Sequence, residues 1–329
     1  MSDVAAEIKN LKTYFYTDSG IVKAVDDVSF IIRKGRTLGI VGESGSGKSI
    51  ASLSMLRLIQ SPPGRIVGGE ILLNGRDLLK CTGEEMREVR GNEIAMIFQE
   101  PMTSLNPVMK VGGQVSEALR RHRGLAKDEA RRKAIEMLGE VRIPNPEKCY
   151  GKYPHQLSGS MRQRVMIAMA LSCDPEVLIC DEPTTALDVT MQAQILELIN
   201  DLREKLGSAI VMITHDMGVI AETADEVIVM YAGKIMESAP VDDLFKRPLH
   251  PYTFGLLNSI PKLHTNDEKL MSIRGTVPKP TDMPPGCPFN PRCDDARDIC
   301  RAECPDAILA EGRLVACWKY HSGWEEETE

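Results

Sequence analysis

Residues 42–49 combine glycines, a lysine and a serine at a spacing that suits phosphate binding. They read Gly-Glu-Ser-Gly-Ser-Gly-Lys-Ser and match the pattern G-x4-G-K-[ST]. Glycines let backbone N–H groups curl around a phosphate, and the N-terminal end of a following helix adds positive charge. We expect Lys48 to reach the β- and γ-phosphates of ATP and the Ser49 hydroxyl to ligate Mg²⁺. The expected phosphate-binding residues are Gly42, Ser44, Gly45, Ser46, Gly47, Lys48 and Ser49. The alternative is a glycine-rich turn without chemistry.

Two carboxylates, Asp181 and Glu182, follow directly on four apolar residues, 177–180. A buried strand that ends in two acids sets them at its tip, which in a parallel sheet lies beside the phosphate loop. There Asp181 would hold Mg²⁺, usually through water, and Glu182 would polarise the water that attacks the γ-phosphate. The alternative is a solvated acidic turn, which the phosphate loop upstream disfavours.

The elements that position these residues follow an α/β pattern. Residues 1–40 read as short strands, such as 21–25 and 28–32, which Asp26 and Asp27 separate. Residues 38–41 form an apolar strand that runs into the phosphate loop. A helix is predicted from Lys48. Further apolar strands are predicted at 94–98, 177–180, 209–213 and 227–230. They alternate with helical stretches such as 193–206, which is typical of a parallel sheet covered by helices.

Several short motifs resemble those of the ATP-binding-cassette (ABC) ATPases. Residues 157–161, Leu-Ser-Gly-Ser-Met, resemble the LSGGQ signature and lie shortly before the acidic pair. Gln99 resembles the Q-loop glutamine, residues 186–188 (Ala-Leu-Asp) the D-loop, and His215 the switch histidine. The resemblance implies an ABC ATPase domain over residues 1–240, with a RecA-like parallel core, an antiparallel β subdomain and an inserted helical subdomain at about 100–170.

The resemblance also implies roles and a second chain. Glu182, His215 and Gln99 would act in hydrolysis, and Ser49, Gln99 and Asp181 would hold Mg²⁺. Ser158, Gly159 and Asp188 would contact nucleotide across the interface with a partner. One chain carries a single copy of each motif, so its signature would complete the site of a second ABC ATPase, either a sibling or a copy of itself.

Two positions leave alternatives open. Phe15 matches the family position that stacks on the nucleobase, Tyr16 lies next to it, and a buried core aromatic is an equal alternative. Ser160 replaces the second glycine of the signature, so its side chain either crowds the phosphate or adds a contact. Met161 in place of glutamine resembles one of the two ATPase subunits of peptide importers.

The rest of the chain is similar to the dipeptide, oligopeptide and nickel importer group. Residues 99–107 resemble its Q-loop flank, residues 250–257 its H-P-Y-T segment, and residues 241–329 its Cys-rich extension. The closest likeness is to the D-type ATPase of a dipeptide importer. Such importers add a second ATPase, two transmembrane permease subunits and an extracytoplasmic solute-binding protein. Because no residue of this chain is expected to contact the transported solute, import of nickel or another solute remains an alternative. A soluble ABC ATPase without transport is an alternative from another class.

Five of the nine cysteines crowd the C-terminal extension, which suggests metal or cluster ligation in a reducing compartment. No C-x2-C pair is present, so the spacing suits a wrapped cluster as well as zinc. The resembling importers carry a [4Fe–4S] centre here, which implies Cys287, Cys293, Cys300 and Cys317 as ligands, with Cys304 as the spare; Zn²⁺ and free thiols are the alternatives.

Charge and composition limit the kinds of partner that the chain can bind. The net charge of −7 disfavours nucleic acid, because phosphate binding needs a positive field. No stretch approaches the roughly 18–20 apolar residues that cross a bilayer. The acidic residues 1–7 do not resemble a signal peptide. We therefore expect a peripheral protein on the cytoplasmic face of a membrane.

Overall fold

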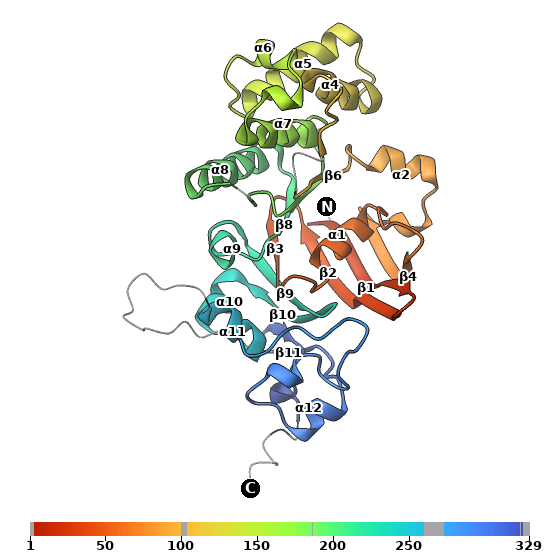
Figure 1. The fold of residues 1–329 in the computed structure, drawn as a ribbon, viewed down its shortest axis with the longest axis vertical. Coiled ribbons are helices and arrows are strands. Elements are labelled where there is room, and N and C mark those ends of the chain that lie inside the picture. The colour runs from red at the N-terminus through yellow and green to blue at the C-terminus, as the bar shows by residue number, and fades with distance from the viewer. Residues whose placement is uncertain (1–2, 100–103, 186, 260–272, 323, 325–329) are drawn as a thin grey trace. The chain divides into compact units, whose positions relative to one another are not determined.

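The computed structural model describes residues 3–99, 104–185, 187–259, 273–322 and 324 (Figure 1). The chain divides into two compact units, each made of several segments. The first comprises Met1–Ala6, Ile32–Thr37 and Leu73–Met212, and the second Glu7–Ile31, Leu38–Leu72 and Ile213–Glu329. Each unit is described separately. In the described part of the chain, no helix has the length and apolar character that a membrane crossing needs.

The first unit contains buried parallel strands that end in the acidic pair. β6 (Ile94–Ile97) pairs in parallel with β7 (Val177–Asp181), from Ile94 opposite Val177 to Ile97 opposite Cys180, and β8 (Ala209–Ile213) lies on the other side of β7. All residues of β7 and β8 are buried. Continuous apolar sequence is what a strand covered on both faces requires. The predicted strands are therefore confirmed, as is the parallel pairing of β6 with β7.

A long helix follows the acidic pair. α8 (Val189–Leu206) begins at Asp188, whose carboxylate accepts a hydrogen bond from the Met191 N–H at 2.9 Å. It ends at Gly207, whose φ of 69° is the left-handed conformation that glycine adopts most easily at a helix end. Its buried face carries Ile195, Leu196, Leu198, Ile199 and Leu202. The smaller α2 (Gly83–Val89) begins with a capping box at Thr82.

The middle of the first unit is helical, as predicted for residues from about 100 to 170. It contains α4 (Val111–His122), α5 (Lys127–Glu140), α6 (Pro146–Tyr150) and α7 (Gly159–Leu171), which gather together in Figure 1. Their core is formed by Val115, Leu119, Ala130 and Ala134. Gly112 lets the Tyr150 ring approach closely, because a Cβ there would meet the ring at 2.0 Å. Residues 100–103, at the start of this stretch, lie outside the described residues.

The second unit contains most of two long N-terminal strands, which corrects the expectation of short ones. β1 (Val4–Thr17) and β2 (Gly20–Arg33) each have 14 residues, and β4 (Gly64–Leu73) is the other neighbour of β1. Asp27, expected to separate two strands, lies inside β2 with a φ of 66°. The Asn10 side chain donates a hydrogen bond to the Asp27 carboxylate at 3.1 Å. The hydrogen bond from Asn10 gives the Asp27 carboxylate a partner, and β2 continues through both acidic residues.

The same unit holds the strand that precedes the phosphate loop. β3 (Thr37–Val41) pairs in parallel with β9 (Glu226–Tyr231), and β10 (Lys234–Pro240) pairs antiparallel with β9. β12 (Arg313–Val315) pairs antiparallel with β10, and β11 (Ile308–Ala310) with β12. The C-terminal residues therefore extend the sheet that contains β3.

Helices complete the second unit. α1 (Lys48–Met55) follows the phosphate loop, as predicted, and α9 (Met217–Thr223) precedes β9. α10 (Val241–Lys246), α11 (Pro251–Asn258) and the short α12 (Asp298–Ala302) belong to the C-terminal part. Glu237 of β10 is completely buried and accepts hydrogen bonds from the Leu249 and His250 N–H groups, both at 2.9 Å. These bonds hold the segment that leads into α11.

Candidate functional site

The loop at residues 42–49 joins β3 directly to α1, in the second unit. Gly42 has a φ of 149°, and a Cβ there would lie 2.1 Å from the Met230 carbonyl oxygen. Gly47 has a φ of 102°, and a Cβ there would lie 2.3 Å from the Ala24 carbonyl oxygen. Both positions thus need glycine for conformation and for space. The neighbouring strands therefore constrain the loop at Gly42 and at Gly47, close to its two ends.

Lys48 is nearly buried at the base of this loop. Its Nζ donates hydrogen bonds to the carbonyl oxygens of Gly42 at 2.7 Å and Glu43 at 3.0 Å. The Ser46 hydroxyl lies 3.4 Å from the same nitrogen. The ammonium group therefore lies where the loop curves around it, which is the position from which a lysine can reach bound phosphates.

The acidic pair lies in the first unit, at the end of β7. Asp181 is the last residue of the strand and is 7% exposed. Glu182 has a φ of 46°, which turns the chain sharply after the strand. Its Oε2 accepts hydrogen bonds from Gln99 Nε2 and from Thr185 Oγ1, both at 2.9 Å. The structure thus brings the predicted Gln99 and Glu182 into direct contact.

The signature segment forms the start of α7 in the first unit. Ser158 is the N-cap, and its Oγ accepts a hydrogen bond from the Met161 N–H at 3.3 Å. The Ser160 hydroxyl lies 3.2 Å from the Ser158 hydroxyl, within hydrogen-bonding distance. Apart from its chain neighbours and the backbone of its own helix, no atom of the described residues lies within 4 Å of a Cβ built on Gly159, so this face of the turn is open. An open helix N-terminus of this kind suits an anion.

The other predicted nucleotide-site residues divide between the units. His215 follows β8 and is exposed in the second unit, together with the phosphate loop. Asp188 caps α8 in the first unit, together with Gln99, Asp181, Glu182 and Ser158. Ala186 of the D-loop motif lies outside the described residues. The roles of all these residues stay predictions.

The three N-terminal aromatic residues differ in their surroundings. Phe15 is half-buried, and its ring packs on the start of β4, where a Cβ on Gly64 would lie 2.9 Å from the Phe15 Cε1. Tyr16 is exposed, with the Arg65 guanidinium 6.0 Å from its ring centre. Tyr14, which sequence reasoning passed over, donates a hydrogen bond to Asp26 Oδ1 at 2.5 Å. Stacking of a base on Phe15 stays a prediction.

The C-terminal cysteines form a second candidate site, in the second unit. A small cavity of about 20 Å³ is lined by four cysteines, Cys287, Cys293, Cys300 and Cys317. Cys304 lines two other cavities instead. These four are the cysteines that the resemblance implies as ligands, and their role as ligands stays a prediction. Nevertheless, no three His, Cys, Asp or Glu side chains in the described ranges are placed as they would be around a metal ion.

Burial controls the chemistry of these thiols. It raises the pKa of the Cys287 thiol to about 12 and that of the Cys317 thiol to about 11. Protonated thiols do not ligate metal, so any metal must displace their protons. The cavity is also lined by His250, Phe289 and Trp318, which sequence reasoning did not assign to it. His250 lies far from the cysteines in the sequence, so its position beside the same cavity could not be predicted from spacing.

Comparison with known proteins shows which family the chain belongs to. Residues 25–185 match the family model described as ABC transporter, and residues 236–300 match the model of the oligopeptide/dipeptide transporter C-terminal region. The oligopeptide transport ATP-binding protein AppD of Bacillus subtilis (strain 168) is 53% identical, over 98% of each chain. The oligopeptide transport ATP-binding protein OppD of Salmonella typhimurium (strain LT2) is 49% identical, over 97% of this chain and 94% of OppD.

A solved structure shares the cassette. The ATP-binding cassette MJ0796, in a dimeric post-hydrolysis state bound to ADP and Pi, matches with a TM-score of 0.64 and 27% identity, over 72% of this chain and 98% of MJ0796. A glycine-rich loop after β3 and an acidic pair at the end of β7 are typical of P-loop ATPases, and the match to the ABC transporter model shows that this ATPase is of the ABC type. With relatives about half identical over nearly its whole length, the chain belongs to the ATP-binding subunits of the oligopeptide and dipeptide ABC transporters.

Proposed function

We propose that this chain hydrolyses ATP to power the import of short peptides across a membrane, at whose cytoplasmic face it is bound peripherally. The supporting observation is the contact between Gln99 and Glu182 at the end of β7. A carboxylate that a neutral hydrogen-bond donor holds in one direction is suited to orienting an attacking water. The peptide cargo rests on the relatives, AppD and OppD, which are named as oligopeptide transport proteins.

The reaction assigns one task to each group. The Glu182 carboxylate accepts a proton from the attacking water, and the new P–O bond forms as the bond to the β–γ bridging oxygen breaks. The Lys48 ammonium neutralises charge on the β- and γ-phosphates, and His215 holds the γ-phosphate. Ser49, Gln99 and Asp181 offer oxygen donors for Mg²⁺, which would neutralise charge on the same phosphate oxygens. Phe15 stacks on the base.

The site is completed by a second ATPase subunit. Ser158, Gly159 and the N-terminal end of α7 would contact the γ-phosphate bound to the partner, and Asp188 would lie at the same interface. ATP then holds the two subunits together, and its hydrolysis releases them. Two transmembrane permease subunits and an extracytoplasmic solute-binding protein complete the proposed importer. We propose residues 1–240 as the ATPase domain and 241–329 as the extension.

The test of this function is transport by the assembled complex. The chain, its partner ATPase and the two permeases are placed in proteoliposomes with ATP inside and the solute-binding protein and labelled substrate outside. Uptake of a tripeptide that Lys48→Ala abolishes is the expected result. Uptake of nickel alone would contradict the peptide assignment, and hydrolysis that proceeds without permeases or uptake would favour an ATPase without transport.

We also propose that the four converging cysteines bind a [4Fe–4S] cluster. The donor set fits in type, because iron–sulfur clusters are held by four thiolates. Anaerobic reconstitution with iron and sulfide should produce a brown protein with broad visible absorption. Cys287→Ser should remove the colour, whereas Cys304→Ser should keep it. A colourless protein that releases zinc would show that the site holds zinc.

A further inference from the structure

Glu43 lies in the glycine-rich loop but is not among the expected phosphate-binding residues, and its side chain is held by Arg292 of the C-terminal extension. Arg292 Nη1 lies 2.5 Å from Glu43 Oε2, and Arg292 Nη2 lies 3.0 Å from Oε1, so the two groups form a bidentate ion pair. The pair joins residues 249 positions apart within the second unit. A bidentate arginine–carboxylate pair fixes direction as well as distance.

The Arg292 guanidinium is itself held rigidly. It is 8% exposed, its Nε donates to the Arg274 carbonyl oxygen at 2.9 Å, and its Nη1 also lies 3.3 Å from the Tyr231 hydroxyl oxygen. The Phe289 ring lies beneath it, with the guanidinium carbon 5.9 Å from the ring centre. The hydrogen bonds to Glu43 raise the pKa of Arg292 further above its ordinary value. These contacts fix the Arg292 side chain, which in turn holds the Glu43 carboxylate in one position.

A second contact holds the backbone of the same residue. The Glu43 N–H donates a hydrogen bond to the Tyr252 hydroxyl oxygen at 2.8 Å. Tyr252 belongs to α11 and is completely buried, with its ring centre 4.7 Å from that of Tyr231 and 5.2 Å from that of Phe289. Both the peptide nitrogen and the side chain of Glu43 are thus attached to the extension.

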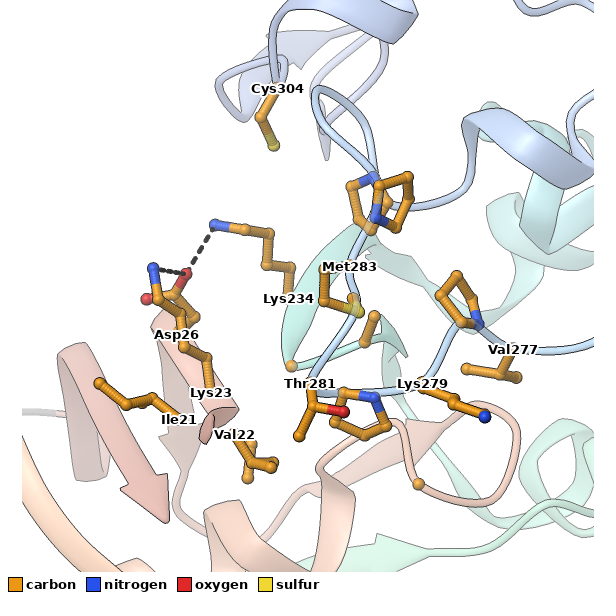
Figure 2. A pocket seen from close by; sticks show the side chains of 18 of the residues that line it. Ile21, Val22, Lys23, Asp26, Lys234, Val277, Lys279, Thr281, Met283 and Cys304 are labelled. Carbon is orange, nitrogen blue, oxygen red and sulfur yellow. Dashed lines mark ion pairs between the residues drawn. The ribbon is translucent and has the colours of Figure 1, made fainter. Parts of the chain in front are cut away.

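The extension also borders the tip of the loop. A cavity of about 580 Å³ lies there. Figure 2 shows Val22 and Lys23 on one side of it and the extension residues Val277, Lys279 and Met283 on the other. Ser44 and Gly45 of the loop form part of its wall. The loop therefore has the extension beside it at two consecutive places, at Glu43 and at the following two residues.

From these contacts we infer that Arg292 and Tyr252 are positioning residues for nucleotide binding, and that the extension acts as a clamp on the phosphate loop. The inference rests on the proposed ATPase function. A glycine-rich loop samples many conformations when it is free, and ordering it on binding weakens affinity. Fixing Glu43 orders the loop before nucleotide arrives, so the clamp strengthens binding without touching the nucleotide.

The test measures nucleotide affinity of the full-length chain, by titration with a fluorescent ATP analogue. Glu43→Gln and Arg292→Gln should each raise the Kd about tenfold, which corresponds to about 1.4 kcal/mol. The double variant should bind no more weakly than either single variant, because both remove one interaction. Arg292→Lys should fall between, because lysine keeps the charge and loses the bidentate geometry. Tyr252→Phe removes only the hydroxyl and should raise the Kd severalfold.

A matched control separates positioning from general stability of the extension. Arg313 is also buried in the extension and donates hydrogen bonds to the Asp243 and Arg247 carbonyl oxygens, at 3.1 and 2.8 Å. Arg313→Gln should lower the melting temperature without changing the Kd. Amide hydrogen exchange at residues 42–47 should accelerate in Arg292→Gln and stay unchanged in Arg313→Gln.

Two results would overturn the clamp. One is a Kd that stays at the wild-type value in Glu43→Gln and Tyr252→Phe; the other is a Kd that rises equally in Arg313→Gln. Failure of the wild-type chain to bind ATP would instead contradict the proposed function, so the two failures are distinguishable.

Discussion

Gln99 and Glu182 lie 83 residues apart in the chain, and the Gln99 side-chain amide donates a hydrogen bond of 2.9 Å to the Glu182 carboxylate. Thr185 donates a second hydrogen bond to the same carboxylate oxygen. The amide and the hydroxyl restrict the directions in which the carboxylate can accept a proton from a third group. A carboxylate oriented in this way is suited to positioning one water molecule.

Replacement of this carboxylate should separate binding from hydrolysis. Glu182→Gln keeps the shape of the side chain and removes its basicity, so we expect the hydrolysis rate to fall about 10²- to 10⁴-fold with the ATP Kd little changed. The measurements are phosphate release by the assembled complex and ATP-dependent association of the two ATPase subunits, which should persist in the variant. Glu204→Gln, at an exposed glutamate of α8, is the control and should hydrolyse ATP at the wild-type rate. Normal turnover in Glu182→Gln would refute the role of Glu182.

Lys48 should be required for both loop geometry and charge. Lys48→Ala removes the donor to the Gly42 and Glu43 carbonyl oxygens as well as the cation for the phosphates. We expect the hydrolysis rate to fall about 10²- to 10³-fold, as for other preorganised electrostatic donors. Lys34→Ala, outside the loop, is the control. Steady-state hydrolysis at saturating ATP checks the prediction, and a variant that retains a tenth of the activity would contradict it.

Ser160 tests whether the departure from the signature affects turnover. Its hydroxyl lies next to that of Ser158, the N-cap of α7. Ser160→Gly frees the Ser158 hydroxyl for phosphate and removes a side chain from the close approach, so hydrolysis by the assembled complex should rise severalfold. The rate should be measured with the partner present, since the signature acts on the partner's nucleotide. An unchanged rate would show that Ser160 is neutral.

Metal loading of the cysteine site should depend on pH. Burial raises the pKa of Cys287 to about 12 and that of Cys317 to about 11, so both thiols carry protons below that range in the metal-free chain. Loading releases these protons, and affinity should therefore fall as pH falls from 8 to 6. Competition with a chelator at the two pH values measures this. Equal affinity at both would mean that the thiols are already ionised.

The local elements of the fold could be predicted from the sequence alone. β3, the phosphate loop and α1 follow one another along the chain. The apolar run, the glycines and the lysine that predict them therefore lie within one short segment. Apolar runs likewise predicted β6, β7, β8 and β9, because a strand buried on both faces needs apolar residues throughout. The exception is β2, whose two acidic residues suggested a break, whereas Asn10 of the neighbouring strand accommodates Asp27.

The relations between distant residues were decided only by the tertiary structure. The contact of Gln99 with Glu182 depends on the pairing of β6 with β7, and the ion pair of Arg292 with Glu43 on the return of the extension to the sheet of β3. Four of the five C-terminal cysteines gather around one cavity for the same reason. Spacing along the chain carries no information on such contacts, because they form only when strand pairing and core packing bring the segments together. The sequence by itself therefore predicted the chemistry of the nucleotide motifs, and only the tertiary structure showed that Arg292 and Tyr252 contact Glu43.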